Sequence, residues 1–395
     1  MTQFSAAAPA TVSHPISHLL WFHERFGKPQ VYALLLLCVF AAQCCWLAAH
    51  RPVTNLEMTY LSPAHVAGMG DAELQVHSPL VSALAGIATA SVFPPDVDST
   101  AWRVLLRLPF IVIGGLLGAS LWYVSRRLYG NAGGYTALVL YAFSPAMIER
   151  WSAVEPDVIA AWGMFGCIFT GIAVAHTLYA PRDVVLWNWR RILLLGVSIG
   201  VAAAAVSTTV VAIPIALGFM LYLAPHRKGA AVAILVASCA VGAAVWLAAY
   251  SFSLSAIAAD LRLSLPHGVT TAPFRLGVMY ALAAGFLLHN GPAFVILLIM
   301  ALGCWIGWRK TRFFGTAAPL ITAVFFACFG VAVSHQNVLV FIYLCLPFLF
   351  VFVAGVSADL LELKPGFGSA LVKALIFAAL GSHVLFSLTN LLALR

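Results

Sequence analysis

Two carboxylates stand at the ends of apolar runs in a chain that carries few charges. Glu57 lies within the stretch "RPVTNLEMTY", directly after an apolar run that ends near Ala49, and Asp157 closes the triplet "EPD" at the start of another. An ionisable group at the boundary of a membrane span is costly, so it is a candidate functional residue by default. The structural alternative for Asp157 is an ordinary helix cap, because Pro156 suits a first helical turn and an acid favours a helix N-terminus.

Two basic residues, Arg107 and Arg150, fall near the same predicted boundary. Together with Glu57 and Asp157 they would form a polar cleft that opens to the lipid interface. The chemistry that suits such a set is group transfer from a lipid phosphate. A carboxylate acts as general base on an acceptor hydroxyl, and an arginine holds the phosphate leaving group.

The elements that position these residues follow from the composition. The chain has 395 residues, of which 63% are hydrophobic and only 9% are charged, and its mean hydropathy is +0.99. A water-soluble domain does not present such a surface to solvent, so we expect an all-α polytopic membrane protein. Because a bilayer core takes roughly 20 apolar residues per helix, the spans are predicted at 31–49, 103–124, 132–149, 156–180, 192–224, 229–250, 291–308, 315–333, 337–358 and 369–394.

The run 192–224 is too long for one crossing, and it carries "STTV" in its middle and a proline at position 214. We therefore expect a helical hairpin here, which brings the total to about eleven transmembrane helices. Basic residues flank both ends of the run, in "NWRR" and "HRK". Two crossings agree with this charge pattern.

Charge predicts the orientation of the chain. Basic residues accumulate in short cytoplasmic loops, and here they gather at Arg126–Arg127, Arg190–Arg191, Arg227–Lys228 and Arg309–Arg312. The net charge of +8 is therefore a topology signal and not a sign of nucleic-acid binding, because the basic residues do not form one patch. We expect an inner-membrane protein in which residues 1–30 form a cytoplasmic N-terminal segment without a removable signal peptide.

The long loops fall on the predicted external side, at 50–102 and at 251–290. We therefore expect the functional face to be external. The apolar stretches 80–93 and 274–288 are too short to span a bilayer, and they are predicted to be helices at the membrane interface. Residues 31–395 are expected to form a single transmembrane domain, without a soluble C-terminal domain.

Five segments in the first half of the chain follow one another in an informative order. They are "LEMTY" with Glu57 and Tyr60, "HSPLVSAL" from His77, "RLPFIVIGG" from Arg107, "ALVLYAFSPAMIE", and "EPDVIAAWG" with Asp157. This order resembles the glycosyltransferases of the GT-C superfamily, especially the protein O-mannosyltransferase and lipid A aminoarabinose transferase branch. There an external "DE-x-x-Y" motif, a "PPL" segment, "RLPS" at the second span, "SP" after the third span and an Asp at the fourth come in the same sequence.

Such enzymes move a sugar from a polyprenyl-phosphate carrier to an acceptor on the external face. The resemblance implies a GT-C-like fold, with Glu57 beside the catalytic position and Asp157 as the second acid of the site. This chain has Leu56 where the family's motif has its catalytic Asp, so either Glu57 has taken over as the base or the site is inactive. The hairpin also lacks a Lys that many relatives carry after a Thr, so one candidate phosphate contact is missing.

The other candidates are polar residues expected near the same face. The predicted substrate-binding residues are Tyr60, His77, Arg107, Arg150, Glu155, His335 and Gln336. For the histidines, a structural role in a turn or at the interface is the alternative. A divalent cation would need two or more oxygen ligands, which Glu57 could supply together with Asp157 or Glu155, and whether one binds is left open.

Three classes of function remain. The first is an inverting glycosyltransferase with Glu57 as general base, Asp157 orienting the acceptor or a metal, and Arg107 near the phosphate. Its partners would be a polyprenyl-phosphate sugar donor, a lipid, glycan or protein acceptor, and membrane lipids, with no nucleic acid. The second is a non-catalytic GT-C-like subunit or lipid-binding scaffold of a membrane complex. The third is a transporter or flippase of lipid-linked material, which the scarcity of acids within the spans disfavours.

Overall fold

The computed structural model describes residues 28–61, 78–89, 99–179, 189–264, 273–333 and 338–393. Every regular element in these ranges is helical, and six of the helices are long and apolar enough to cross a membrane. Shorter apolar helices accompany them, at Ser207–Leu223, Pro292–Gly307 and Phe314–Gly330. The predicted all-α polytopic membrane fold is therefore confirmed.

Helix α2 (Pro29–His50) packs against α6 (Thr100–Ala142), which contains the predicted span 103–124 and the larger part of the predicted span 132–149. The backbone of α6 leaves the helical conformation at Gly130, where φ is 73°. The chain turns back there. The Tyr141 hydroxyl in the second half donates a hydrogen bond to the carbonyl of Gly114 in the first half at 2.6 Å, which shows that the two halves lie side by side. Glycine adopts this left-handed backbone without the strain that a side chain would add, so Gly130 sets the reversal.

The predicted hairpin at 192–224 consists of α10 (Trp189–Ala205), the short 3₁₀ helix η2 (Ser207–Val211) and α11 (Ala212–Leu223). Both long arms pack against α8 (Pro156–Thr177). A Cβ atom on Gly163 would lie 2.7 Å from the backbone nitrogen of Ala202 in α10, and one on Gly171 would lie 3.5 Å from Ala216 Cβ in α11. Helix α11 therefore returns along α8, and the chain reverses at η2. The next helix, α12 (Lys228–Ala249), packs on α10.

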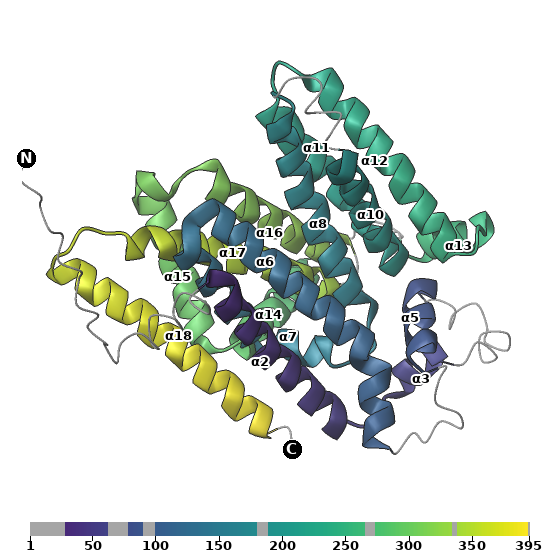
Figure 1. The fold of residues 1–395 in the computed structure, drawn as a ribbon, viewed down its shortest axis with the longest axis horizontal. Coiled ribbons are helices and arrows are strands. Elements are labelled where there is room, and N and C mark those ends of the chain that lie inside the picture. Colours follow the sequence, from purple (N-terminus) through teal and green to yellow (C-terminus); the bar gives the residue numbers. More distant parts are fainter. Residues whose placement is uncertain are drawn as a thin grey trace, which may run out of the picture.

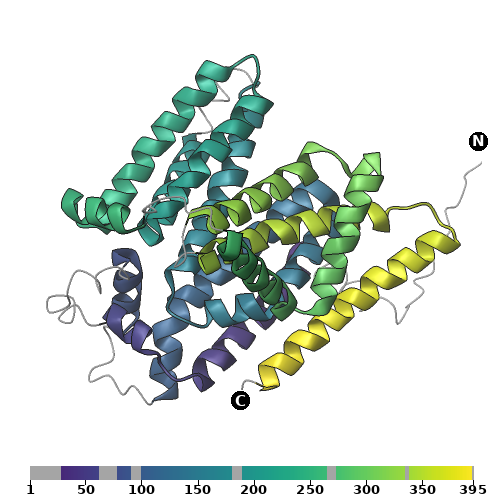
Figure 2. The same cartoon turned by 180° about the vertical axis from the view of Figure 1, so that it is seen from behind.

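Two helices are enclosed by the rest of the bundle. The apolar windows of α8 and α17 (Val338–Leu361) are 78% and 83% buried, against 22% for α12 and 17% for α18 (Phe367–Ala393). Phe165 and Phe169 of α8 contact Phe348 of α17, with ring centroids 5.5 and 5.9 Å apart. Figures 1 and 2 show α18 along one edge of the bundle and α10 to α13 grouped on another side. The faces of α12 and α18 are therefore available to lipid.

Four further helices complete the second half of the chain. They are α14 (Pro273–His289), α15 (Pro292–Gly307), η3 (Arg309–Thr311) and α16 (Phe314–Val333). Helix α16 pairs with α17, and α15 packs between α17 and α18. Helix α14 covers the whole stretch 274–288, for which the sequence predicts an interfacial helix.

The short helices gather at one end of the bundle, which we call the α3 end. Its elements are α3 (Asn55–Leu61), α5 (Pro79–Thr89), α7 (Pro145–Trp151), the first turn of α8, η2 and α13 (Leu254–Ser264). The Ser78 hydroxyl, just before α5, donates to the carbonyl of Ala204 at 2.8 Å. This bond holds α5 beside the last residues of α10, in the arrangement visible in Figure 1.

Candidate active site

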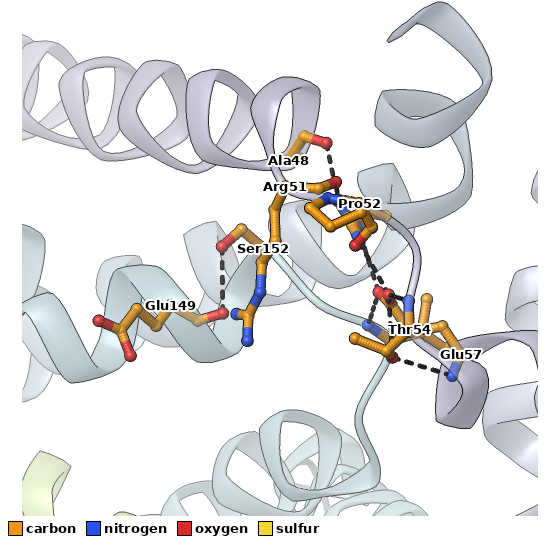
Figure 3. A network of polar contacts seen from close by, with 9 residues as sticks. Ala48, Arg51, Pro52, Thr54, Glu57, Glu149 and Ser152 are labelled. Carbon is orange, nitrogen blue, oxygen red and sulfur yellow. Dashed lines mark hydrogen bonds and ion pairs between the residues drawn. The ribbon is translucent and has the colours of Figure 1, made fainter. Parts of the chain in front are cut away.

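Helix α3 begins with a reciprocal cap. The Thr54 backbone N–H donates to Glu57 Oε2 at 2.9 Å, and the Glu57 backbone N–H donates to Thr54 Oγ1 at 3.3 Å. This T-x-x-E capping box satisfies two backbone donors at the helix start, and it orients the Glu57 carboxylate. The two side chains can be followed in Figure 3.

Arg107 of α6 holds the Glu57 carboxylate with two parallel hydrogen bonds. Its Nε donates to Oε1 at 2.8 Å and its Nη2 to Oε2 at 2.7 Å, the bidentate geometry that arginine and carboxylate prefer. Nη1 donates to the carbonyls of Ala48 and Arg51, and Nη2 also to that of Pro52, at 2.7, 2.9 and 3.0 Å. All five guanidinium N–H groups thus have acceptors. Arg107 ties α2, α3 and α6 together, and no donor is left for a phosphate.

Glu57 also anchors the segment that leads into α8. Its Oε1 accepts a hydrogen bond from the Val154 backbone N–H at 3.0 Å. Burial by itself raises the pKa of this carboxyl, but the hydrogen bonds and charge of Arg107 outweigh it, helped by the N–H groups of Thr54 and Val154, and lower the pKa below its usual value. An ionised carboxylate with these partners favours a positioning role. The assignment of Glu57 as the general base stays a prediction from the sequence.

A second charged cluster, which we call the Arg150 cluster, lies where α7 ends and α8 begins. Arg150, in the last turn of α7, forms an ion pair with Glu155 at the N-cap of α8, and its Nη1 lies 3.4 Å from Asp157 Oδ2. The side chains of Arg150 and Glu155 are 23% and 20% exposed, against 0% and 2% for Arg107 and Glu57. The second cluster can therefore meet a ligand, whereas the first cannot without rearrangement.

Aromatic side chains from two other helices complete this cluster. The guanidinium carbon of Arg150 lies 4.0 Å from the ring centroid of Tyr343 in α17, a cation–π contact. Tyr60 of α3 is buried. Burial, followed by the negative charges of Asp157 and Glu155, raises the pKa of Tyr60. Its hydroxyl therefore stays protonated, and it lies close enough to the two acids to be influenced by their charge.

Helix α3 links the two clusters, because Glu57 and Tyr60 stand one turn apart on it. The structure thus brings six of the predicted site residues to the α3 end, although in two groups: Glu57 with Arg107, and Tyr60, Arg150, Glu155 and Asp157 together. The other three predictions, His77, His335 and Gln336, lie outside the described residues.

Three contributors to the site were not among the predicted residues. The sequence does contain a signal for Thr54, because a threonine three residues before a glutamate is the capping-box pattern at a helix start. Val154 acts through its backbone, which no side-chain pattern reveals. Tyr343 lies in the predicted span 337–358, but the sequence offers no sign that its ring meets Arg150.

A divalent cation does not fit the second cluster as it stands. Among the residues that the structure describes, no group of three histidine, cysteine, aspartate or glutamate side chains is arranged to hold a metal. Arg150 already pairs with both Glu155 and Asp157, and Glu57 is paired with Arg107. We therefore route no chemical step through a metal.

By sequence, neither a protein-family model nor a curated protein matches the chain. Its structure is similar to an oligosaccharyltransferase from Archaeoglobus fulgidus tethered to an acceptor peptide, with a TM-score of 0.59 at 15% identity over 93% of this chain and 55% of that one. The archaeal oligosaccharyltransferase AglB from the same organism, in complex with an inhibitory peptide and a dolichol-phosphate, gives a TM-score of 0.57 at 12% identity over 94% and 56%. The chain thus spans little more than half the length of these proteins. At such identities the similarity shows the fold alone: the protein is an integral membrane protein whose all-α fold is similar to that of these oligosaccharyltransferases.

Proposed function

We propose that the protein is a membrane glycosyltransferase that moves a sugar from a polyprenyl-phosphate carrier to an acceptor at the external face of the membrane. The observation that carries this proposal is the partly exposed cluster of Arg150, Glu155 and Asp157 at the α3 end. The fold supports it, because one structural neighbour was solved with an acceptor peptide and another with a dolichol-phosphate.

Asp157 is the general base in this proposal. It accepts the proton of the acceptor hydroxyl while the acceptor oxygen forms a bond to the anomeric carbon of the sugar. The bond between that carbon and the phosphate oxygen breaks, and the lipid phosphate leaves with the electron pair. Attack from the side opposite the phosphate inverts the anomeric configuration.

Arg150 offsets the charge that develops on the departing phosphate. Its present partners are carboxylates, and the separation of 3.4 Å from Asp157 is long for an ion pair with a hydrogen bond. A phosphate that binds Arg150 would compete with Asp157 for it, which leaves the Asp157 carboxylate free to take a proton. Glu155 and the ring of Tyr343 keep the guanidinium in place.

Glu57 and Arg107 position the residues of this site and do not contact the substrate. Glu57 accepts a hydrogen bond from the Val154 backbone, and it shares helix α3 with Tyr60. The pair therefore fixes both the segment that leads to Asp157 and the helix that carries the Tyr60 hydroxyl. Arg107 therefore acts on the geometry of the cluster, and the phosphate contact that the sequence suggests for it passes to Arg150.

The charge distribution supports an external α3 end. The Gly130 turn of α6, beside Arg126 and Arg127, lies at the opposite end of that helix from Thr100. Basic residues of short loops remain on the cytoplasmic side. We therefore place the cluster on the external face of the inner membrane, with the N-terminus in the cytoplasm.

A non-catalytic GT-C-like subunit or lipid-binding scaffold is the second candidate. It is favoured by Leu56, which stands at the position of the family's catalytic acid and is 41% exposed. The neighbouring Glu57 is committed to Arg107. A scaffold would bind the lipid without turning it over.

The test measures binding and transfer in the same proteoliposomes. The purified protein is supplied with radiolabelled undecaprenyl-phosphate sugars, and both lipid binding and the loss of label from the lipid are followed. An enzyme releases the sugar to an acceptor extracted from the native membrane, and the label leaves the lipid fraction. Binding with no release across the whole donor panel would contradict the enzyme and favour the scaffold.

A further inference from the structure

A second set of polar side chains lies at the break between α10 and α11, and the mechanism above does not use it. We call it the break cluster: Ser207, Thr208, Trp246, Tyr250 and Asp260. Ser207 and Thr208 belong to η2 and are 2% and 4% exposed. The other three come from α12, its C-cap and α13. Helix α13 packs on η2, which brings the set together.

Several polar atoms of the break cluster are buried without a hydrogen bond. The Tyr250 hydroxyl donates to Asp260 Oδ2 at 2.9 Å. The Ser207 hydroxyl and the Trp246 indole N–H lie close enough to Tyr250 to influence its hydroxyl, yet neither has a hydrogen-bond partner of normal geometry. The Thr208 hydroxyl has none either. Buried polar groups are normally paired, so unpaired ones clustered together indicate a place for a polar ligand.

The break cluster stands at the same end of the bundle as Asp157. Helices α8 and α10 run in opposite directions and touch where Gly163 meets Ala202. Asp157 and Thr208 each lie six residues from that contact, towards the α3 end. The two sets of polar groups are therefore at a similar depth, both near the α3 end.

The turn between α12 and α13 is strained. Ser251 and Phe252 both adopt left-handed backbone conformations, with φ of 50° and 61°. Such conformations are uncommon for residues other than glycine, and they persist where the surroundings demand them. The turn places Phe252 and Leu254 outward, 73% and 70% exposed, while Ile257 is buried. Two exposed apolar side chains therefore lie at the start of α13, and Asp260 further along this helix accepts the hydrogen bond from Tyr250.

The chemistry of the break cluster favours a neutral polyol over a phosphate. It offers hydroxyls, an indole and one carboxylate, and it contains no cationic side chain; Arg262 on α13 is exposed. A sugar hydroxyl can donate to Asp260 and accept from Thr208 or Trp246, and a sugar ring can stack on an aromatic face. We propose that the break cluster binds the sugar ring of the lipid-linked donor, while Arg150 binds the phosphate of the same donor. This inference rests on the proposed function.

The test compares binding of a lipid phosphate with and without its sugar. The probes are undecaprenyl phosphate and its mannose, glucose and aminoarabinose esters, titrated onto the full-length protein in nanodiscs. The variants are Thr208→Val and Tyr250→Phe. Thr209→Val is the matched control, because Thr209 is equally buried in η2 but its hydroxyl already donates to the Val206 carbonyl at 2.7 Å.

We expect the unaltered protein to bind at least one sugar ester about tenfold more tightly than the bare lipid. Thr208→Val and Tyr250→Phe should remove most of this preference and leave the affinity for the bare lipid unchanged, and Thr209→Val should keep the preference. Equal weakening of bare and sugar-bearing lipids would show a structural role only, and no preference in the unaltered protein would overturn the subsite while the proposed function stands. Failure to bind any of the lipids would contradict the proposed function itself.

Discussion

At the scale of residues, the two clusters of arginine and carboxylate differ in burial, and we propose that they differ in role accordingly. The Glu57–Arg107 pair is removed from solvent, and every guanidinium donor of Arg107 has an acceptor, whereas the side chains of Arg150 and Glu155 are 23% and 20% exposed and that of Asp157 is 9% exposed. A buried pair is weak evidence for net stabilisation, but breaking it is costly because it leaves an uncompensated buried charge. The first pair is therefore tested through stability, and the second through activity.

Glu57→Gln should destabilise the protein strongly. The substitution leaves the Arg107 charge buried without its counter-ion, which costs about 3–5 kcal/mol. Thermal unfolding of detergent-solubilised protein measures the effect, and Glu149→Gln serves as the control, because Glu149 is 28% exposed and its ion-pair partner His289 is 49% exposed. A Glu57→Gln variant as stable as the control would show that the buried pair does not hold the α3 end together.

The pH dependence of stability should carry the signature of Glu57. Because its pKa is lower in the folded state than in the unfolded chain, the folded protein gains stability above the unfolded pKa and loses it as the pH falls towards the folded value. The unfolding midpoint should therefore drop between about pH 5 and about pH 3. The difference between the unaltered protein and Glu57→Gln should shrink over the same range. A constant difference would argue against the Arg107 contacts as the cause.

At the scale of elements, interruptions of helices position the functional groups. Gly130 reverses α6, η2 reverses the chain between α10 and α11, and Gly291 separates α14 from α15 with φ of 104°. At the last break the Ser144 hydroxyl donates a hydrogen bond to Asn290 Oδ1. Because Ser144 is the N-cap of α7, this bond ties α7 to the turn beside Gly291. The breaks at η2 and at Gly291 bring polar side chains into buried positions, namely Ser207, Thr208 and Asn290.

Alanine at these glycines should separate backbone strain from crowding. A Cβ on Gly130 meets nothing within 4 Å, whereas one on Gly291 would lie 2.8 Å from Phe386 Cδ1. Gly130→Ala should therefore cost about 1–3 kcal/mol from strain alone, and Gly291→Ala should cost more. Gly218→Ala, in the helical and open part of α11, is the control and should be neutral or slightly stabilising. Equal stability of all three variants would show that the positive-φ turns are not required.

Much of the element order is predictable from the sequence, because apolar length alone decides where a helix can cross a bilayer. The predicted span 369–394 corresponds to α18, Phe367–Ala393, and the predicted hairpin reverses at η2. The meeting of Arg107 with the carbonyls of Ala48, Arg51 and Pro52 was not predictable, since it depends on how α2 and α6 pack. The sequence also could not assign each acid to its own arginine.

At the scale of the whole molecule, the helical bundle has an enclosed centre and lipid-facing sides. Helices α8 and α17 form the centre, and both contribute to the Arg150 cluster, through Asp157 and Tyr343. The chain covers little more than half the length of the oligosaccharyltransferases that share this fold. What the described bundle provides is a membrane domain with a charged cluster at one end.

The proposed orientation can be checked with introduced cysteines. Arg51 is exposed at the α3 end and meets Arg107 only through its backbone carbonyl. Gly366, between α17 and α18, is exposed with open space around it. In a cysteine-free background, a membrane-impermeant maleimide applied to intact cells or spheroplasts should label Arg51→Cys and leave Gly366→Cys unlabelled until the membrane is opened. The reverse pattern would place the Arg150 cluster in the cytoplasm.

The central claim is that Asp157, and not Glu57, is the reactive carboxylate. It is tested most directly by the rate of sugar transfer from undecaprenyl-phosphate donor in Asp157→Asn and Glu57→Gln, each measured at matched folded levels and matched donor occupancy. We expect Asp157→Asn to bind donor normally and to lose transfer by about 10²–10⁴-fold, and the folded fraction of Glu57→Gln to retain most of its turnover. Full turnover in Asp157→Asn, or loss confined to a stably folded Glu57→Gln, would contradict the account.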